Sequence, residues 1–389
     1  MIITDSKKII VNFSVLLYFT SLSLVNQFSV SILYMLFYIS LLMCASIGLL
    51  TTYGKSLKKS CLVLALLLIS GALGIVNTNN IPNNYLVYLI FYFFASFSFS
   101  NKNISEKTLL FAILLNAAII IGKYLTVGIY GRIFVSGSNN FVSVYLMYPT
   151  VIYYSIVSKN RSDVKMFPIL IVWVLTLLAR GRGGIISVTL FLVMVYYLKY
   201  KSMRSSKKII INIFTFLTVA VLVLNISTII NMIGSSVIME QFNERGGFES
   251  SRTRFWAEYI NHTFSDVKNF LYGTDVSKLF IGRELDGNPH NSLIEIHMLN
   301  GMLGLSIVIV LLINNVIKSL KNENYLFCFC MFFLLIRGFT DHVLWNAYGT
   351  PVLFFFMFFD TKPVVKKEEL LLSICQLKEK KRRVLSLLR

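Results

Sequence analysis

The sequence predicts an all-α polytopic membrane protein. Of its 389 residues, 56% are hydrophobic and only 14% are charged, whereas soluble domains carry about 25% charged residues. Apolar runs of about 20 residues, long enough to cross a bilayer, recur from one end of the chain to the other. A membrane β-barrel would instead show short segments of alternating hydrophobicity. We therefore expect about 12 transmembrane helices.

These helices are expected at about 9–25, 28–50, 61–77, 85–100, 108–127, 141–158, 166–180, 184–199, 208–233, 291–317, 324–340 and 343–360. The first run follows two lysines, as in a signal peptide, but no small-residue cleavage site follows it, so we interpret it as a retained helix. The chain then divides into helices 1–9 (1–233), a long polar loop (234–290), helices 10–12 (291–360) and a basic tail (361–389).

The lysines predict the orientation. Of 24 lysines, 21 lie in the tail or in alternate connecting segments, and 3 lie on the other side. Because cytoplasmic segments collect basic residues, both termini are predicted to be cytoplasmic and the 234–290 loop to be outside. The basic tail is either an amphipathic helix on the anionic inner leaflet or solvated. The net charge of +19 follows from topology and tail, so we do not predict nucleic-acid binding.

The arginines follow a different pattern from the lysines. Of 13 arginines, 8 lie on the outer side: Arg132, Arg180, Arg182, Arg245, Arg252, Arg254, Arg283 and Arg337. The rigid donor fork of arginine suits bidentate binding of phosphate or carboxylate. This distribution indicates either an outward-facing site for an anionic ligand or scattered loop charges.

Two segments concentrate these arginines. In "LLARGRGGIISV" (177–188), Arg180 and Arg182 stand between two apolar runs, and the glycines allow a tight turn or a close approach to a ligand. Snorkelling of arginines at a helix end is the alternative. In "GGFESSRTRFWAEYINHTF" (246–264), Arg252 and Trp256 are four residues apart and share a helix face, whereas Arg254 lies on another. This helix is amphipathic and is expected to lie along the membrane surface.

The stretch "GNPHNSLIEIHMLNGMLG" (287–304) joins the polar loop to an apolar run. Asn291 or Ser292 can cap the helix that begins here. His290 then sits at a helix N-terminus, where the helix dipole favours the neutral imidazole that a general base requires. His297 is seven residues further on, about 10 Å deeper. We expect His297 to be a buried, hydrogen-bonded core residue, and Glu295 to have a supporting role.

The segment "LLIRGFTDHVLWNAYG" (334–349) gathers Arg337, Asp341 and His342 at the outer end of a predicted helix. Arg337 and Asp341 are four residues apart, which places them on one helix face. A structural ion pair is one interpretation. Contact between Arg337 and an anionic ligand is the other.

Together these segments resemble the O-antigen polymerase/ligase superfamily of bacterial membrane glycosyltransferases. The resemblance rests on "GRGG" between two spans, on "SRTRFW…LYGTD" in the long loop, and on "HN" opening a span with paired glycines further along, "HNSLIEIHMLNGMLG". Their order, topology and loop position match over about 175–310. The turn "GTD" (273–275) departs from the family, which often has a second glycine there. The resemblance implies a GT-C-like fold without a nucleotide-sugar site.

The resemblance also implies roles for residues. His290 would be the base that activates the acceptor hydroxyl, and arginines would hold the diphosphate of the donor. Arg182 matches the turn arginine better than Arg180 because two glycines follow it, and Arg252 matches the loop arginine, with Arg254 in reserve. The remaining candidates are Arg337 for the diphosphate, and Asn291, Glu295 and Asp341 as supporting residues.

The implied donor is an undecaprenyl-diphosphate-linked oligosaccharide, and the acceptor is another lipid-linked repeat unit. The reaction would take place on the periplasmic side of the bacterial inner membrane. Membrane lipids and a chain-length regulator protein are further implied partners. An O-antigen ligase, which transfers the glycan to the lipid A core, is the alternative within the family. A flippase for lipid-linked oligosaccharide is the alternative of another class, although it would more often show internal repeats and charges at mid-membrane.

No metal or other cofactor is expected. The five cysteines lie in or beside predicted helices or in the tail, which favours neither a disulfide framework nor a thiolate metal site. Metal-dependent glycosyltransferases of this general fold would place carboxylates in the first outer loop, and the sequence around Asn26 and Gln27 has none. Fixed guanidinium groups could stabilise the departing diphosphate in place of a metal.

Overall fold

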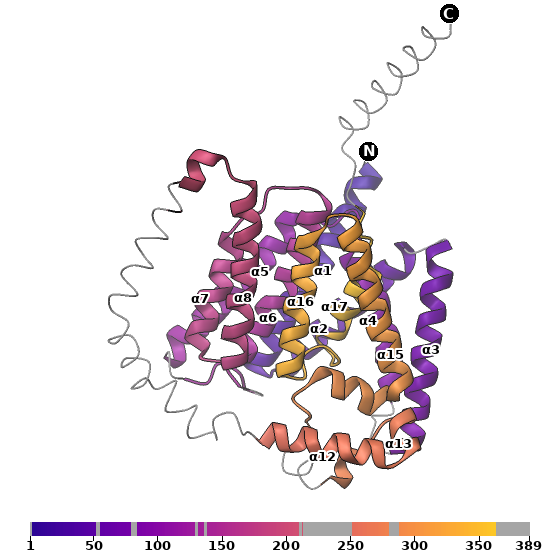
Figure 1. The fold of residues 1–389 in the computed structure, drawn as a ribbon. Coiled ribbons are helices and arrows are strands. Elements are labelled where there is room, and N and C mark those ends of the chain that lie inside the picture. Colours follow the sequence, from indigo (N-terminus) through magenta and orange to yellow (C-terminus); the bar gives the residue numbers. More distant parts are fainter. Residues whose placement is uncertain are drawn as a thin grey trace, which may run out of the picture.

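The computed structural model describes residues 2–51, 55–78, 84–128, 131–135, 138–209, 212, 251–279 and 288–362. Every regular element within these residues is a helix, as predicted (Figure 1). The elements are α1 (Ile2–Phe28), α2 (Ser31–Thr51), α3 (Lys55–Thr78), α4 (Tyr85–Phe99), α5 (Glu106–Val127), α6 (Phe141–Lys159), α7 (Phe167–Ala179), α8 (Arg182–Ser202), α12 (Ser251–Ser265), α13 (Val267–Tyr272), η1 (Val276–Lys278), α15 (Ser292–Lys321), α16 (Tyr325–Thr340) and α17 (Thr350–Phe358).

Seven of the described helices are long and apolar enough to cross a membrane: α1, α2, α3, α5, α6, α8 and α15. Three shorter apolar helices, α4, α7 and α16, also coincide with predicted runs. The character of a membrane protein with many helices is therefore confirmed. The ninth predicted helix (208–233) and the tail beyond residue 362 lie almost wholly outside the described residues, so the count of 12 stays a prediction.

The prediction of the twelfth helix, 343–360, is wrong over its first seven residues. Helix α17 covers only nine residues, from Thr350 to Phe358, which is too short to cross a bilayer alone. Asn346 explains the late start, because its side-chain oxygen accepts the backbone N–H groups of Tyr348 (3.0 Å) and Gly349 (2.8 Å) and so closes a turn. Residues 341–349 form an irregular segment instead of the start of a helix.

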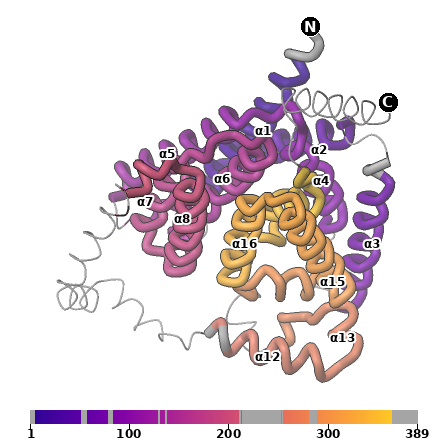
Figure 2. Tube along the Cα trace, turned by 45° about the horizontal axis from the view of Figure 1, so that its top comes forward, coloured from indigo at the N-terminus to yellow at the C-terminus, as the bar shows by residue number. Residues whose placement is uncertain are grey.

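Helix α6 forms the centre of the bundle. Its candidate span is 89% buried, compared with 28–56% for the other six. It packs against α5, α7 and α16, and a helix that is apolar all round is expected to be buried. Figure 2 shows α7 and α8 on one side of the molecule and the pair α3 and α15 on the other. The outer helices expose large apolar side chains, such as Val76 (80%) and Leu125 (83%), as lipid-facing surfaces do.

The helices alternate in direction, so their connections fall at two ends (Figure 1). The lysine-bearing start of α3, the segment before α5 and the connection between α6 and α7 lie at the end where α1 begins (Figure 1). The α7–α8 turn, the start of α15 and the end of α16 lie at the opposite end, beside α12 and α13. The lysine pattern thus separates two ends of the bundle. The assignment of the lysine-rich end to the cytoplasm stays a prediction.

Helix α15 is kinked, which the sequence analysis did not anticipate. Gly301 has non-helical torsions (φ 58°, ψ −168°), and a Cβ at this position would lie 2.0 Å from the backbone oxygen of Leu271. Only glycine permits this approach of α13. In Figure 1, the section of α15 before the kink runs across the end of the bundle, while the rest runs alongside α3.

The kink changes the position of His297. Because its section lies across the bundle end, His297 is not deeper along a straight span, and that part of the prediction is wrong. The side chain is 5% exposed. Nδ1 contacts the Tyr259 hydroxyl at 2.5 Å, and Nε2 contacts the backbone oxygen of Phe270 at 2.9 Å. The prediction of a buried, hydrogen-bonded core histidine is confirmed, and its contacts join α15 to α12 and α13.

Candidate active site

Four segments that are distant in the sequence meet at Thr340 and Asp341. Arg252 of α12 donates from Nη1 to the backbone oxygen of Thr340 at 2.9 Å. In the first turn of α8, a Cβ on Gly183 would lie 2.9 Å from the Thr340 hydroxyl oxygen, so the glycine allows close contact. Ser292, at the start of α15, donates to the backbone oxygen of Asp341 at 2.9 Å. The structure therefore joins the segments that the sequence analysis singled out.

His290 and Asp341 form the centre of this group. His290 Nδ1 lies 3.2 Å from Asp341 Oδ1, and the side chains are 24% and 6% exposed. An ionised carboxylate only accepts hydrogen bonds, so Nδ1 carries the proton and Nε2 is left as an acceptor. A buried carboxylate thus fixes the tautomer and orientation of a partly exposed imidazole.

The backbone of His290 lies in the left-handed region. Its φ is 46°, which is uncommon for a residue other than glycine. The His290 N–H donates to the Asn288 side-chain oxygen at 2.9 Å, which supports this conformation. Strained backbone of this kind clusters at functional sites, and here it directs the one partly exposed member of the histidine–aspartate pair.

Arg337 holds the other oxygen of Asp341. Its Nη2 lies 3.4 Å from Asp341 Oδ2, and its side chain is 2% exposed. Its Nε and Nη1 donate to the hydroxyls of Ser143 (3.4 Å) and Thr340 (3.0 Å). The predicted ion pair is confirmed. Because the guanidinium is enclosed by protein partners, we assign Arg337 a positioning role toward Asp341 rather than direct contact with a ligand.

His342 is a second imidazole on the same carboxylate. Its Nδ1 and backbone N–H lie 3.3 Å and 3.0 Å from Asp341 Oδ1. Burial alone would raise the pKa of Asp341, but hydrogen bonds from His290 and His342 and the charge of Arg337 hold that pKa well below its usual range. Burial works against charged His342, but its bond to Asp341 and the nearby carboxylates raise its pKa. His342 was not among the predicted site residues, although it directly follows Asp341.

The α7–α8 turn places its two arginines differently. Arg180 ends α7 with a left-handed backbone (φ 57°), and its N–H donates to the backbone oxygen of Leu177 at 3.1 Å. Arg182 is the first residue of α8, next to the glycine that contacts Thr340. Both side chains are half-buried. Because Arg182 opens the helix turn that contacts the centre of the site, its position is the more favourable of the two for a ligand contact there.

Helix α12 is held against the site by two bonds one turn apart. Besides the contact of Arg252 with Thr340, Trp256 donates from Nε1 to the backbone oxygen of Pro289 at 2.9 Å. The predicted shared face of Arg252 and Trp256 is confirmed, and it faces the end of α16 and the residues just before α15. Arg254 is exposed, which places it away from these contacts.

The start of α15 is fixed by two polar side chains. Asn291 caps the helix, because its side-chain oxygen accepts two first-turn N–H groups at 2.9 Å and 3.3 Å. Ser292 accepts the N–H groups of Val343 (2.9 Å) and Leu344 (3.0 Å). From the sequence, Ser292 was predicted only as a possible helix cap. Its hydroxyl instead holds the irregular segment that carries Asp341.

Glu295 lies one turn further along α15. Its Oε2 atom is buried and has no hydrogen-bond partner among the described residues. The predicted supporting role of Glu295 stays a prediction.

His290, Asp341 and His342 are also the group of described residues that could ligate a metal ion. They offer two nitrogens and one oxygen within 4.8 Å of one another, a donor set that suits a transition metal. However, the Arg337 guanidinium already lies 3.4 Å from the same carboxylate, and its positive charge opposes a second cation. The ligand atoms therefore suit a metal ion, but the nearby positive charge of Arg337 does not favour one.

Comparison with known proteins adds no relative. No family model matches the chain, and no curated protein matches it.

Proposed function

We propose that this protein is an O-antigen polymerase, a glycosyltransferase that uses a polyprenyl-diphosphate-linked glycan as its donor. It would transfer this glycan to a sugar hydroxyl of a second lipid-linked repeat unit at the periplasmic face. The observation that carries the proposal is the pairing of His290 with buried Asp341 (3.2 Å) at the point where two arginine-bearing segments meet. This combination supplies a base and cations in one place.

The surroundings of the pair favour an anionic group. Arg182 and Arg252 belong to the two segments that contact Thr340. The N-termini of α8 and α15, at Gly181 and Asn291, also lie at this end of the bundle. A helix N-terminus carries about half a positive charge and readily binds phosphate. A diphosphate would therefore meet both fixed guanidinium groups and helix dipoles here.

The proposed reaction is a displacement at the anomeric carbon of the donor sugar. The acceptor hydroxyl oxygen forms the new bond to this carbon, and the bond from the carbon to the diphosphate oxygen breaks. The electron pair leaves with the polyprenyl diphosphate, and the hydroxyl proton passes to His290 Nε2. Asp341 stabilises the resulting imidazolium through Nδ1. Arg182 and Arg252 stabilise the charge that develops on the leaving group.

The central test replaces the His290 side chain and keeps the backbone conformation at this position. Asparagine tolerates the left-handed region, so His290→Asn preserves the conformation at this position. We expect glycan elongation to fall by about 10²–10⁴-fold, the usual contribution of a general base, with normal amounts of folded protein in the membrane. His262→Asn is the matched control, because His262 lies on α12 and contacts Asn269. Near-normal elongation by the His290 variant would refute the assignment.

Two further experiments separate the alternatives. In a strain that lacks the gene, core with one repeat unit would indicate a polymerase, whereas bare core with long glycan on the lipid carrier would indicate a ligase. The purified protein should retain its activity in EDTA. Loss of activity in EDTA and its recovery with a divalent metal would replace the metal-free mechanism with one that uses His290, Asp341 and His342 as ligands.

A further inference from the structure

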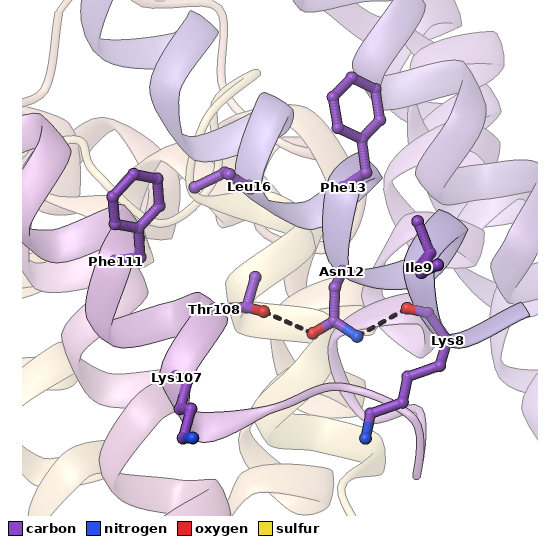
Figure 3. Close-up of a pocket in the computed structure, with 8 residues that line it drawn as sticks. All are labelled: Lys8, Ile9, Asn12, Phe13, Leu16, Lys107, Thr108 and Phe111. Atoms are coloured by element: carbon purple, nitrogen blue, oxygen red, sulfur yellow. Dashed lines mark hydrogen bonds between the residues drawn. The ribbon is translucent and has the colours of Figure 1, made fainter. Parts of the chain in front are cut away.

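A second polar feature lies at the lysine-rich end, between α1 and α5. These helices border a cavity of about 480 Å³ whose lining includes Lys8 and Lys107. Figure 3 shows the two amines at one end of the cavity, Asn12 and Thr108 in the middle, and the side chains of Phe13 and Phe111 at the other end. The cavity thus changes from charged to polar to apolar along its length.

The middle of the cavity is rigid. Asn12 accepts from the Thr108 hydroxyl (2.6 Å) and from the Ser105 N–H (2.9 Å). It also donates to the backbone oxygens of Lys8 (2.7 Å) and Asn103 (2.9 Å). This one amide therefore fixes the part of α1 around Lys8 and Asn12 relative to the first turn of α5, and with it the spacing of the backbones that carry the two lysines.

The two lysines are available to a ligand. Both are exposed, and neither has a carboxylate within ion-pair distance among the residues whose side chains the structure describes, which begin at Ser6. The neighbouring carboxylate of Glu106 is engaged elsewhere, because it accepts from Asn160 (2.9 Å) and Ser162 (2.6 Å) in the α6–α7 connection. Two positive charges therefore face the cavity without a described counter-charge.

The apolar end is open to the surroundings. Ile9, Phe13 and Phe111 are 68%, 55% and 53% exposed. On a membrane protein such side chains contact acyl chains, whereas lysines at the helix ends lie at headgroup level. The order of charged, polar and apolar surface along the cavity is therefore that of a phospholipid.

We propose that this cavity binds one anionic phospholipid, with its phosphate between Lys8 and Lys107 and an acyl chain along Phe13 and Phe111. A soluble anion would use only the lysines and would gain nothing from the apolar end. The lipid would come from the leaflet that faces the lysine-rich end, which the lysine distribution predicts to be the cytoplasmic one. This site is at the opposite end of the bundle from His290, so it stands independently of the proposed function.

The test is native mass spectrometry of the full-length protein titrated with phosphatidylglycerol and, separately, with phosphatidylcholine. We expect wild type to prefer phosphatidylglycerol. The variant Lys8→Gln/Lys107→Gln should bind it about 30-fold more weakly, from the usual contribution of two lysines near an anionic lipid surface. Lys58→Gln/Lys59→Gln is the matched control, because it removes two exposed lysines from the start of α3 at the same end and should leave binding unchanged.

Two more arms decide between lipid and phosphate. Phe111→Ala should weaken phosphatidylglycerol several-fold, since its exposed ring contacts the acyl chain in the proposal. Glycerol 3-phosphate, which has the phosphate and no chain, should fail to displace the lipid at comparable concentration. Equal losses in both lysine pairs would overturn the proposal in favour of general surface charge. Efficient displacement by glycerol 3-phosphate would overturn it in favour of a simple anion site.

Discussion

Two ion pairs, one at each end of the bundle, show what decides the strength of a charge contact. Lys199 and Asp163, at the lysine-rich end, are 2.5 Å apart, but their side chains are 23% and 75% exposed. Arg337 and Asp341, at the site, are 3.4 Å apart and only 2% and 6% exposed. We expect removal of one partner to cost less free energy in the shorter pair, because water screens an exposed pair, whereas a buried partner left alone keeps its full desolvation cost.

The same contrast extends to the surrounding groups. At the site, Asp341 has His290, His342 and Arg337 around it, so its charge is fixed by several partners. At the other end, Lys8 and Lys107 are exposed and are free to meet an external anion. At the site end the charges position the His290 imidazole, whereas the lysine-rich end presents its charges to the surroundings. The following variants test this difference, beginning with the largest expected effect.

Asp341→Ala should lower the free energy of unfolding by about 3–5 kcal/mol, because it leaves the Arg337 guanidinium buried without its partner. Thermal unfolding of the purified protein in detergent measures this change. The double variant Arg337→Met/Asp341→Leu removes both charges and should recover most of the stability, but it should have no transferase activity because His290 loses its orienting carboxylate. A stable Asp341→Ala protein would show that the pair does not behave as a buried one.

Arg252→Lys should lower activity by about 10- to 100-fold, since an ammonium cannot replace the bidentate fork and the bond to Thr340 is weakened. Arg182→Lys should behave similarly. Steady-state elongation with the lipid-linked donor measures the effect. Arg254→Lys is the matched control on the same helix, and its activity should remain near that of wild type because Arg254 is exposed. Equal losses in the Arg252 and Arg254 variants would remove the argument for a specific diphosphate contact.

His342→Gln should change the pH dependence of stability. The pKa of His342 is raised in the folded protein, so the stability contributed by its protonated form is complete below its usual pKa of about 6.5 and is lost as pH rises through the folded value. The difference in free energy of unfolding between wild type and variant should therefore be largest at low pH and shrink at high pH, as measured by thermal unfolding in detergent. A difference that does not change with pH would exclude a role for the imidazolium.

Asp163→Ala should have the smallest effect, below about 1 kcal/mol in the free energy of unfolding, because exposed ion pairs contribute little. Any effect should also shrink when the salt concentration is raised. The same thermal measurement used for Asp341→Ala gives a direct comparison. A loss as large as that of Asp341→Ala would show that exposure does not decide the strength of these pairs.

Much of the helical architecture could be predicted from the sequence because apolar runs report directly on helices in a membrane. The start of α15 was also predictable, since Asn291 precedes an apolar run and is a favourable capping residue. The late start of α17 was not, because hydrophobicity continues through 343–349 and only the side-chain bonds of Asn346 reveal the turn.

Within the candidate site, the sequence predicted the segments but not their contacts. His290 and Arg252 were found from motif and spacing. The role of Ser292 depends on its bond to Asp341, 49 positions away, and no local pattern encodes such a distance. His342 contacts Asp341, the residue directly before it, but only the packed structure shows that His290 shares this carboxylate. The sequence left Arg337 between two interpretations. Its burial favours a positioning role, and the sequence could not show this because burial depends on how the bundle packs.

The kink at Gly301 has a consequence for how the protein fits the bilayer. A straight α15 of 30 residues would be about 45 Å long at 1.5 Å per residue, well beyond the roughly 30 Å of hydrocarbon. The residues after the kink, 302–321, make a helix of about 30 Å, close to that thickness. The remaining ten residues of α15 lie in the section that runs across the end of the bundle (Figure 1), which begins two residues after His290. The kink thus keeps the candidate base at the end of the bundle instead of letting the extra turns project beyond it.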